Sequence, residues 1–250
     1  MAATHESSSL RDRVVLITGG ARRIGAEIAR TLHAAGANVL IHYRSSAPAA
    51  ALLAEELNRI RSKSAAIHAA DLLSAEAPDQ LVAAALAEFG RLDMLINNAS
   101  TFYPTPIGKI SVAQWDDLMG SNLKAPLFLA QAAAPNLSLQ RGLIINIIDI
   151  HGLKPLKGYP LYSAAKAGLA MLTRSLAREL GPDIRVNGIA PGPVLWEKGM
   201  DEDLKREIIG KTALKRGGDP SDIARTALFL ARDAPYITGQ IIAVDGGRSI

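Results

Sequence analysis

Three residues in the second half of the chain have the types and the spacing needed for proton transfer. Tyr162 and Lys166 stand four positions apart, and Asp149 stands thirteen positions before Tyr162. Residues four apart on a helix share one face, so the Lys166 ammonium can lie beside the Tyr162 phenol and favour the phenolate. Lowering a phenol pKa from about 10 to about 7 takes roughly 4 kcal/mol, and one close cation in a partly dry cleft can supply much of that. The alternative is an exposed helix pair in which the lysine reaches into water.

Asp149 stands where a buried strand would normally end in an uncharged residue. It closes the run "IINIID", in which four aliphatic residues and one asparagine come before it. If the proton of Tyr162 serves a reduction, the side chain at position 149 acts on the reacting group. A carboxylate there opposes the negative oxygen that forms when a ketone is reduced, whereas a serine would stabilise that oxygen by donating a hydrogen bond. Reduction of a carbon–nitrogen double bond has the opposite demand, because the nitrogen must receive a proton. We therefore expect Asp149 to serve proton transfer to a nitrogen, or else to cap a turn at the strand end.

A glycine-rich turn near the start of the chain suits a phosphate group. In "VVLITGGARRIGAEIAR" an aliphatic run leads into Gly19 and Gly20, which allow a sharp turn. Gly25 allows the following helix to pack closely on the strand, and the first N–H groups of that helix are free to bind phosphate. An ordinary tight turn is the alternative, but the position after a first strand and before a helix favours a dinucleotide site.

The segment after the second expected strand indicates which dinucleotide is bound. Sites for the unphosphorylated cofactor usually carry an acid about 20 residues beyond the glycines, whereas this chain reads "HYRSS". Arg44, Ser45 and Ser46 suit a 2′-phosphate, and Arg22 or Arg23 supplies a second cation. We expect the cofactor to be NADPH/NADP+.

These residues require a scaffold of alternating strands and helices. The expected strands are 14–18, 38–43, 65–69, 94–96, 143–148, 185–189 and 240–244. The expected helices are 24–35, 49–61, 78–89, 112–133, 162–180 and 220–231. Apolar strands separated by helices predict an α/β fold, a single doubly wound Rossmann-like domain with a parallel sheet of about seven strands and helices on both faces. Ligands of such folds bind beyond the carboxyl ends of the strands.

We expect one domain over residues 1–250, because no linker rich in proline, glycine or serine divides the chain. Residues 1–12 are polar and are expected to form a flexible tail. Residues 192–218 are polar, charged and punctuated by glycine, and we interpret them as a lid over the substrate. Trp196 lies in this stretch and either lines the pocket or anchors the loop.

The composition excludes several other classes of protein. The chain is 48% hydrophobic and 21% charged, with a net charge of +4. Its basic residues are dispersed and form no stripe for nucleic acid. It has no cysteine, and its five histidines lack the spacing of metal ligands, so we expect no metal. The polar start and the lack of a long apolar run predict a cytoplasmic protein with no membrane partner.

Several further motifs occur in order over nearly the whole chain. They are Thr18-Gly19 with Gly25, Asp71-Leu72, Asn97-Asn98-Ala99, Asn122, the Tyr162 to Lys166 segment, and Pro191-Gly192. Together they resemble the short-chain dehydrogenase/reductase family. The resemblance implies that Asp71 lies near the adenine and that Pro191 and Gly192 lie beside the nicotinamide. It also implies a homotetramer and a catalytic set of Asn122, Asp149, Tyr162 and Lys166, with Asp149 in place of the usual serine. The cofactor-binding residues that we expect are Gly19, Arg22, Arg23, Ile24, Gly25, Tyr43, Arg44, Ser45, Ser46, Asp71, Leu72, Asn98, Ala99, Ser100, Lys166, Pro191, Gly192 and Val194.

Some departures from the family pattern resemble one subgroup, the pteridine reductases and dihydromonapterin reductases. The phosphate turn has Arg23 where the family normally has glycine, and Ser100 replaces the glycine of the Asn-Asn-Ala-Gly motif. The resemblance implies that Arg23 faces the cofactor phosphates and the pterin, and that Phe102 stacks on the pterin. From its residue type alone, Phe102 could equally be a packing residue. The substrate-binding residues that we expect are Arg23, Ser100, Phe102, Asp149, Tyr162 and Trp196.

Three classes of function remain open at this point. The first is an NADPH-dependent pteridine reductase acting on a dihydropterin, with oxidised pterins or dihydrofolate as further substrates. The second is a short-chain carbonyl reductase of the 3-oxoacyl-thioester, sugar or steroid type, which requires Asp149 to act like a serine. The third is a cofactor-sensing protein without catalysis, and the presence of Asn122, Tyr162 and Lys166 together argues against it.

Overall fold

The computed structural model describes residues 9–196 and 199–250. Within them the strands form one seven-stranded sheet in the order β3-β2-β1-β4-β5-β6-β7, and every neighbouring pair is parallel. The strands are β1 (Val14–Ile17), β2 (Asn38–Tyr43), β3 (Ala65–Ala69), β4 (Met94–Asn97), β5 (Leu143–Ile147), β6 (Arg185–Pro191) and β7 (Ile241–Val244). The predicted fold class is confirmed, and each strand bound lies within two residues of its prediction.

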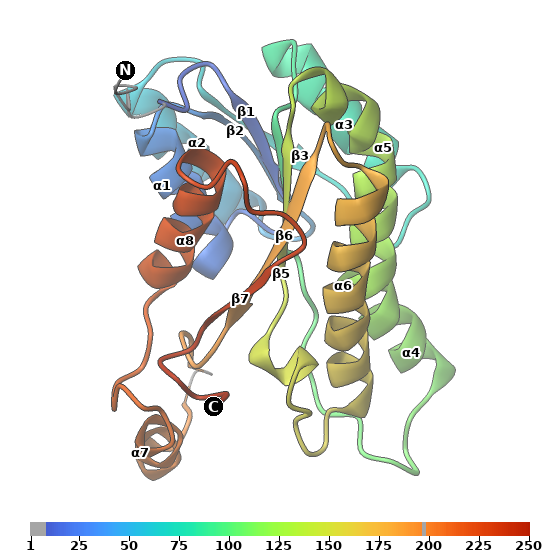
Figure 1. Cartoon of the computed structure of the whole chain (residues 1–250), viewed down its shortest axis with the longest axis vertical. Coiled ribbons are helices and arrows are strands. Elements are labelled where there is room, and N and C mark those ends of the chain that lie inside the picture. Colours follow the sequence, from blue (N-terminus) through green and yellow to red (C-terminus); the bar gives the residue numbers. More distant parts are fainter. Residues whose placement is uncertain (1–8, 197–198) are drawn as a thin grey trace.

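The helices connect these strands and cover the sheet on both sides. They are α1 (Arg23–Ala34), α2 (Ala47–Ile60), α3 (Ala77–Phe89), α4 (Val112–Met119), α5 (Ala125–Leu139), α6 (Pro160–Glu179), α7 (Glu202–Gly210) and α8 (Pro220–Arg232). Figure 1 shows α1, α2 and α8 on one face and α3, α5 and α6 on the other. Because both faces are covered, the central strands are largely aliphatic, and alternate residues enter two separate cores, with Val15 in one and Leu16 in the other.

One predicted helix, 112–133, is in fact divided. A π-helical turn over Gly120–Lys124 separates α4 from α5. Pro126 lies at the start of α5, has no N–H group, and would clash with the carbonyl four residues earlier in a regular helix. The wider turn relieves that conflict, and it places Asn122 inside an element type that is frequent at functional sites.

The strand order reverses between β1 and β4, and this reversal opens the binding crevice of the fold. β1 pairs with β2 on one side and with β4 on the other. The loops that leave β1 and β4 therefore part at the carboxyl edge of the sheet, where α/β folds bind their ligands. The glycine-rich turn and the Asn98 segment are these two loops.

Two other predictions concern the N-terminal tail and the lid. Leu10 is fully buried, and its N–H donates to the Ala35 carbonyl oxygen at 3.0 Å, so the predicted flexible tail does not extend to Leu10. Residues 1–8 of that predicted tail lie outside the described residues. Beyond β6, the stretch predicted as a lid contains the unpredicted helix α7, which has no buried residue. Figure 1 shows α7 beyond the same end of the sheet as the loop after β5. None of the described helices is long and apolar enough to cross a membrane.

Candidate active site

The glycine-rich turn between β1 and α1 is built for close backbone approach. Gly19 has a φ of +58°, which favours glycine. A Cβ atom on Gly25 would stand 2.5 Å from both the Gly19 carbonyl oxygen and the Asn98 Nδ2 atom. Asn98 Nδ2 donates to the carbonyl oxygens of Thr18 at 2.9 Å and Gly19 at 3.0 Å. Asn98 thus fastens the turn to the end of β4, and the cradle that the glycines leave open fits a dinucleotide phosphate.

Cationic and hydroxyl side chains gather beside this turn. Arg22 donates to the Ser46 hydroxyl, which joins the start of α1 to the start of α2. Arg44 and Ser45 are exposed in the same β2–α2 connection. Arg23 has a φ of +55°, a conformation that costs a non-glycine residue on the order of 1 kcal/mol or more. Arg23 thus carries backbone strain at the first position of α1, beside the glycine-rich turn.

The other predicted cofactor residues lie along the carboxyl edge of the sheet. Asp71 follows β3 and accepts a hydrogen bond from the Leu73 N–H at 3.1 Å. Gly192 follows β6, where a Cβ atom would stand 2.6 Å from the Asp245 Cα atom, and Val194 is buried nearby. The further predicted positions are Ile24 at the start of α1, Tyr43 at the end of β2, Leu72 after β3, Ala99 after β4 and Pro191 at the end of β6.

Asp149 and Tyr162 are in direct contact. The Tyr162 hydroxyl donates to Asp149 Oδ2 at 2.8 Å, and the His151 N–H donates to Asp149 Oδ1 at 2.8 Å. Asp149 caps a single 3-10 turn, Ile150–Gly152, directly after β5. One carboxylate oxygen of Asp149 therefore caps a turn, as one prediction expected, and the other accepts from the phenol, while the role in proton transfer stays a prediction.

The electrostatics of Tyr162 differ from the sequence-based expectation. Burial and the neighbouring Asp149 carboxylate raise the pKa of Tyr162 far above its ordinary value, against a smaller lowering contribution from the Ser100 hydroxyl. The expectation that Lys166 brings the pKa of this phenol toward neutrality is wrong for this arrangement. Spacing placed the lysine on the same helix face, but it could not reveal that the phenol hydrogen points at a carboxylate. Tyr162 is held here as a proton-bearing acid.

Lys166 is buried beneath the pair. Its side chain is 2% exposed, and its Nζ atom donates to the Ile147 carbonyl oxygen at 2.9 Å. The same atom lies 5.7 Å from the centre of the Tyr162 ring. Burial lowers the pKa of Lys166 to about 8, and the Asp149 charge opposes that shift. The ammonium is thus a nearby cation without a direct bond to the phenol oxygen.

Asn122 reaches the site through Ser100. The Asn122 side chain is fully buried and donates to the carbonyl oxygens of Thr101 and Leu118, both at 3.0 Å. Its Oδ1 atom accepts a hydrogen bond from the Ser100 hydroxyl at 2.6 Å. The π-helical turn therefore fixes the loop that carries Ser100 and Phe102 against the Asp149–Tyr162 pair.

An aromatic cluster covers the phenol. Phe102 stacks on Tyr159 with ring centres 4.6 Å apart and an interplanar angle of 11°, and it meets Tyr162 edge-on at 4.7 Å. Phe102 remains 44% exposed, so it keeps a surface that a flat ring can cover. Tyr159 escaped sequence reasoning, and its position three residues before Tyr162 was the available signal.

A hydrogen bond joins the two ends of the predicted lid. The Gly218 N–H donates to the Pro193 carbonyl oxygen at 3.0 Å, and a Cβ atom on Gly217 would stand 3.3 Å from the Trp196 ring. Trp196 thus lies against Gly217 at the base of the loop, and its two predicted roles, pocket lining and loop anchor, stay predictions. Within the described residues, no group of three histidine, cysteine, aspartate or glutamate side chains is placed to hold a metal ion.

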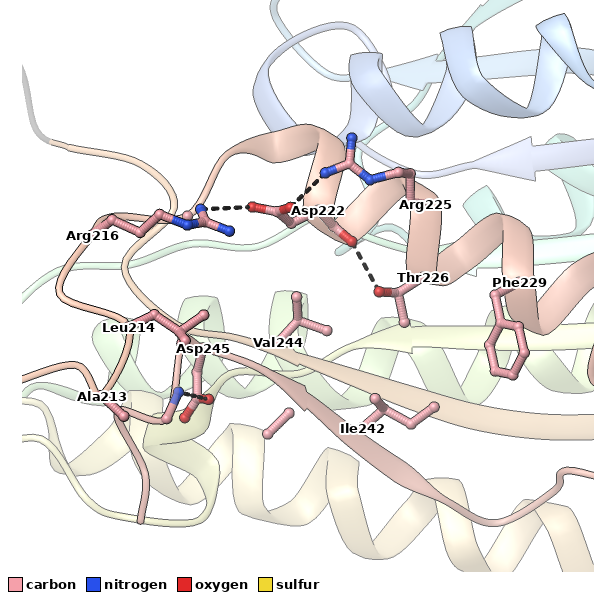
Figure 2. Close-up of a pocket in the computed structure, with 14 residues that line it drawn as sticks. Ala213, Leu214, Arg216, Asp222, Arg225, Thr226, Phe229, Ile242, Val244 and Asp245 are labelled. Atoms are coloured by element: carbon pink, nitrogen blue, oxygen red, sulfur yellow. Dashed lines mark hydrogen bonds and ion pairs between the residues drawn. The ribbon is translucent and has the colours of Figure 1, made fainter.

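A separate groove runs along the outer side of β7. Figure 2 shows this groove, of about 720 Å³, between β7, α8 and the loop that contains Leu214 and Arg216. Arg216 and Arg225 both pair with Asp222 on its rim. None of the predicted catalytic residues is among the described residues that line it.

Comparisons with known proteins agree with this architecture. A family model described as "Enoyl-(Acyl carrier protein) reductase" matches residues 19–249. Pteridine reductase 1 of Leishmania tarentolae is 38% identical, over 95% of this chain and 96% of its own length. The 3-oxoacyl-(acyl-carrier-protein) reductase FabG of Staphylococcus epidermidis is 36% identical, over 94% of this chain and 98% of its own length. A solved structure of a blue fluorescent protein from a metagenomic library, in complex with NADPH, superimposes with a TM-score of 0.89 at 35% identity and covers 97% of this chain and 100% of that one. Relatives with different substrates are thus about equally similar.

Proposed function

The chain belongs to the short-chain dehydrogenase/reductase family, and within it we propose a pteridine reductase that transfers hydride from NADPH to a dihydropterin. It is an NADPH-dependent oxidoreductase, in keeping with its family and with a structural neighbour that binds NADPH. The observation that carries the pterin assignment is the hydrogen bond from Tyr162 to the Asp149 carboxylate.

NADPH supplies the hydride when it is bound. The glycine cradle at Gly19 and Gly25 would hold its diphosphate. Arg44, Ser45 and the Arg22–Ser46 pair would hold the 2′-phosphate with charge-assisted hydrogen bonds. Pro191 and Gly192 lie at the end of β6, where the nicotinamide is expected.

The charge of Asp149 decides between two kinds of acceptor. When Tyr162 gives its proton to the oxygen of a reduced ketone, a phenolate is left facing a carboxylate. Two like charges about 4 Å apart repel by about 4 kcal/mol at an effective dielectric near 20, which is about a thousandfold in rate. A ring C=N nitrogen can take the Tyr162 proton before the hydride arrives, and the resulting iminium cation offsets the repulsion between the phenolate and the Asp149 carboxylate. Hydride addition to the neighbouring carbon then leaves a neutral amine. Asp149 therefore favours hydride transfer to a carbon next to a ring nitrogen.

The neighbouring residues fit a flat, nitrogen-rich substrate. The exposed part of Phe102 provides a stacking surface, and Ser100 offers a hydroxyl beside Tyr162. Arg23, held in a strained conformation next to the phosphate turn, can meet both a phosphate and the pterin ring. Lys166 keeps a positive charge near the phenol while the proton moves from Tyr162 to the substrate.

The stretch 192–218 is proposed to act as the lid over this substrate. Its two ends are joined by the Gly218–Pro193 hydrogen bond, and α7 lies between them with only partly or fully exposed residues. An element with so little buried surface can move at low cost. Trp196 then serves as the fixed base from which the lid closes.

A second candidate is a 3-oxoacyl-thioester reductase, which the FabG relative favours. That reaction forms an anionic oxygen next to the catalytic tyrosine. It would require Asp149 to act like a serine, whereas both oxygens of this carboxyl group accept hydrogen bonds, from the Tyr162 hydroxyl and from the His151 N–H.

A panel of substrates tests the proposal. We expect NADPH oxidation with dihydrobiopterin or dihydromonapterin, and turnover at least a hundredfold slower with acetoacetyl thioesters and simple ketones. Equal or faster turnover of the thioester would reject the pterin assignment. Binding of NADPH without turnover of any member of the panel would support a sensor.

We also propose that the protein is a homotetramer in the cytoplasm. Among the described strands β7 is the last of the sheet, and the apolar groove beside it, lined by Phe229 and Ile242, lies next to the edge that pairs with no other described strand (Figure 2). A second copy of this chain, placed with its own β7 against this edge, would cover both. Light scattering should give four chain masses, and Phe229→Asp should lower that mass. A monomer for the parent protein would contradict the assembly.

A further inference from the structure

His42 occupies a central place in the cofactor half of the molecule. It is the penultimate residue of β2, directly before the Tyr43-Arg44-Ser45-Ser46 segment, and is 2% exposed. Its Nδ1 atom lies 3.1 Å from the Gly19 N–H donor, and its Nε2 atom lies 3.0 Å from the Ala70 carbonyl oxygen. One imidazole thus joins the phosphate turn to the connection that carries Asp71.

The backbone partners fix the form of this ring. A backbone N–H can only donate and a backbone carbonyl can only accept, so Nδ1 must be the acceptor and Nε2–H the donor. The neutral ring with its hydrogen on Nε2 satisfies both partners. A doubly protonated ring would place an N–H at Nδ1 against the Gly19 N–H, and that hydrogen bond would be lost.

Backbone hydrogen bonds join the same three segments, which are the turn after β1, the end of β2 and the connection after β3. The Gly20 N–H donates to the His42 carbonyl oxygen at 2.9 Å, and the Ala70 N–H donates to the Tyr43 carbonyl oxygen at 3.1 Å. A change at His42 therefore acts on both loops that flank the dinucleotide. Neither ring nitrogen is left free to contact a ligand.

We propose that His42 is a positioning residue for NADPH, which in its neutral form holds the phosphate turn in its binding conformation and on protonation releases it. The inference rests on the NADPH part of the proposed function and is independent of the pterin assignment. It makes cofactor affinity sensitive to acid through a residue that does not touch the cofactor.

The surroundings of the ring favour the neutral form at physiological pH. Burial lowers the pKa of His42 below its ordinary value of 6.5. The hydrogen bond to Ala70 and the Asp71 carboxylate oppose that shift, whereas His68 and Arg44 add to it. Because the folded-state pKa is lowered, the contribution of the neutral ring is complete above pH 6.5 and is lost progressively as the pH falls below that value.

The test measures the NADPH dissociation constant by the fluorescence of the bound nicotinamide, from about pH 8 to about pH 5.5. His42→Leu removes both ring bonds. His42→Asn keeps an acceptor near the Nδ1 position that does not titrate. His68→Asn is the matched control, because His68 stands opposite His42 on β3 in the sheet register. Free NADPH takes up a proton on its 2′-phosphate near pH 6, so each variant is compared with the parent protein at the same pH.

We expect His42→Leu to weaken NADPH binding about tenfold at pH 8 and His42→Asn to stay within about threefold of the parent. On acidification to about pH 5.5 the parent should lose a few-fold more affinity than His42→Asn, because a pKa below 6.5 limits this loss to about tenfold at most. His68→Asn should lose at least as much affinity as the parent, since it removes a charge that lowers the pKa of His42. If the NADPH dissociation constants of the parent and of His42→Asn change in parallel with pH, the inference is overturned. This comparison is sufficient by itself if His42→Leu does not fold. A parent protein that does not bind NADPH would instead overturn the cofactor assignment.

Discussion

The two sides of the carboxyl edge of the sheet are built in opposite ways. On the cofactor side, Gly19, Gly25 and Asn98 are fixed by hydrogen bonds and by contacts that leave no room for a Cβ atom. On the lid side, α7 has no buried residue and is held by ion pairs within the helix, such as Lys205–Glu202 and Lys211–Glu207. Exposed pairs of this kind contribute about 0.5 kcal/mol or less each. On our proposal, cofactor recognition is therefore a property of a closely packed backbone, whereas substrate recognition would depend on side chains of an element with little buried surface.

Tyr162→Phe should have the largest effect, because it should lower turnover without changing cofactor binding. The variant keeps the ring that contacts Phe102 but has no proton to deliver, so turnover should fall at least a hundredfold. The NADPH dissociation constant should stay within about twofold of the parent. Stopped-flow turnover and NADPH fluorescence give the two numbers, and Tyr236→Phe, at a fully exposed tyrosine, is the control. A loss in NADPH binding as large as the loss in turnover would show that the two sides are not separable at this residue.

Lys166→Met should lower turnover by about as much, but it should not destabilise the fold. The pKa of Lys166 is lowered to about 8 from 10.5, and a shift of this size corresponds to about 3 kcal/mol spent on burying the charge. Between these two values the unfolded chain binds more protons, so the parent gains stability as the pH rises through that window. We expect the variant to be up to about 3 kcal/mol more stable at pH 7 in urea unfolding, with a gap that closes toward pH 10.5. A variant that is clearly less stable than the parent at pH 7 would refute this reading of Lys166.

Arg44→Asp should act on the cofactor side alone. A charge-assisted bond to the 2′-phosphate is worth roughly 1.5 to 3 kcal/mol, so the preference for NADPH over NADH should fall about ten- to a hundredfold or invert. The ratio of kcat/KM values for the two cofactors measures it. Arg174→Asp makes the same charge change on the exposed face of α6 and should leave the ratio unchanged. Equal use of both cofactors by the parent protein would show that the phosphate is bound elsewhere.

Asp201→Ala should have the smallest effect and should act on the lid side. Asp201 caps α7 by accepting from the N–H groups of Asp203 at 2.7 Å and Leu204 at 3.2 Å. Losing such a cap costs about 1 kcal/mol of helix stability, so the KM for the pterin should rise a few-fold while NADPH affinity stays constant. Asp116→Ala on α4 is the control. If the KM does not move, α7 has no part in covering the substrate.

The sequence predicted the cofactor side in more detail than the substrate side. The seven strands and the turn at Gly19 followed from aliphatic periodicity and from the few residue types that such a turn accepts. Apolar spacing predicts one continuous helix over 112–133, because it does not reveal the π-helical turn that precedes Pro126. The pKa of Tyr162 was placed in the wrong direction, because burial and the direction of the hydroxyl toward Asp149 depend on tertiary packing. Sequence patterns do not predict the contact of Tyr159 or the helix α7 for a different reason, since exposed or loop-flanking residues carry little periodic signal.

Replacement of Asp149 tests the central claim most directly. In Asp149→Ser the hydroxyl can still cap the turn by accepting from the His151 N–H, but the charge beside Tyr162 is gone. Asp149→Asn keeps the shape of the side chain and also removes the charge. We expect kcat/KM for the dihydropterin to fall at least tenfold in both variants, and the serine variant to gain activity toward a simple ketone. Reduction of the dihydropterin by both variants as fast as by the parent protein would contradict the account, because the carboxylate would then have no part in the reaction.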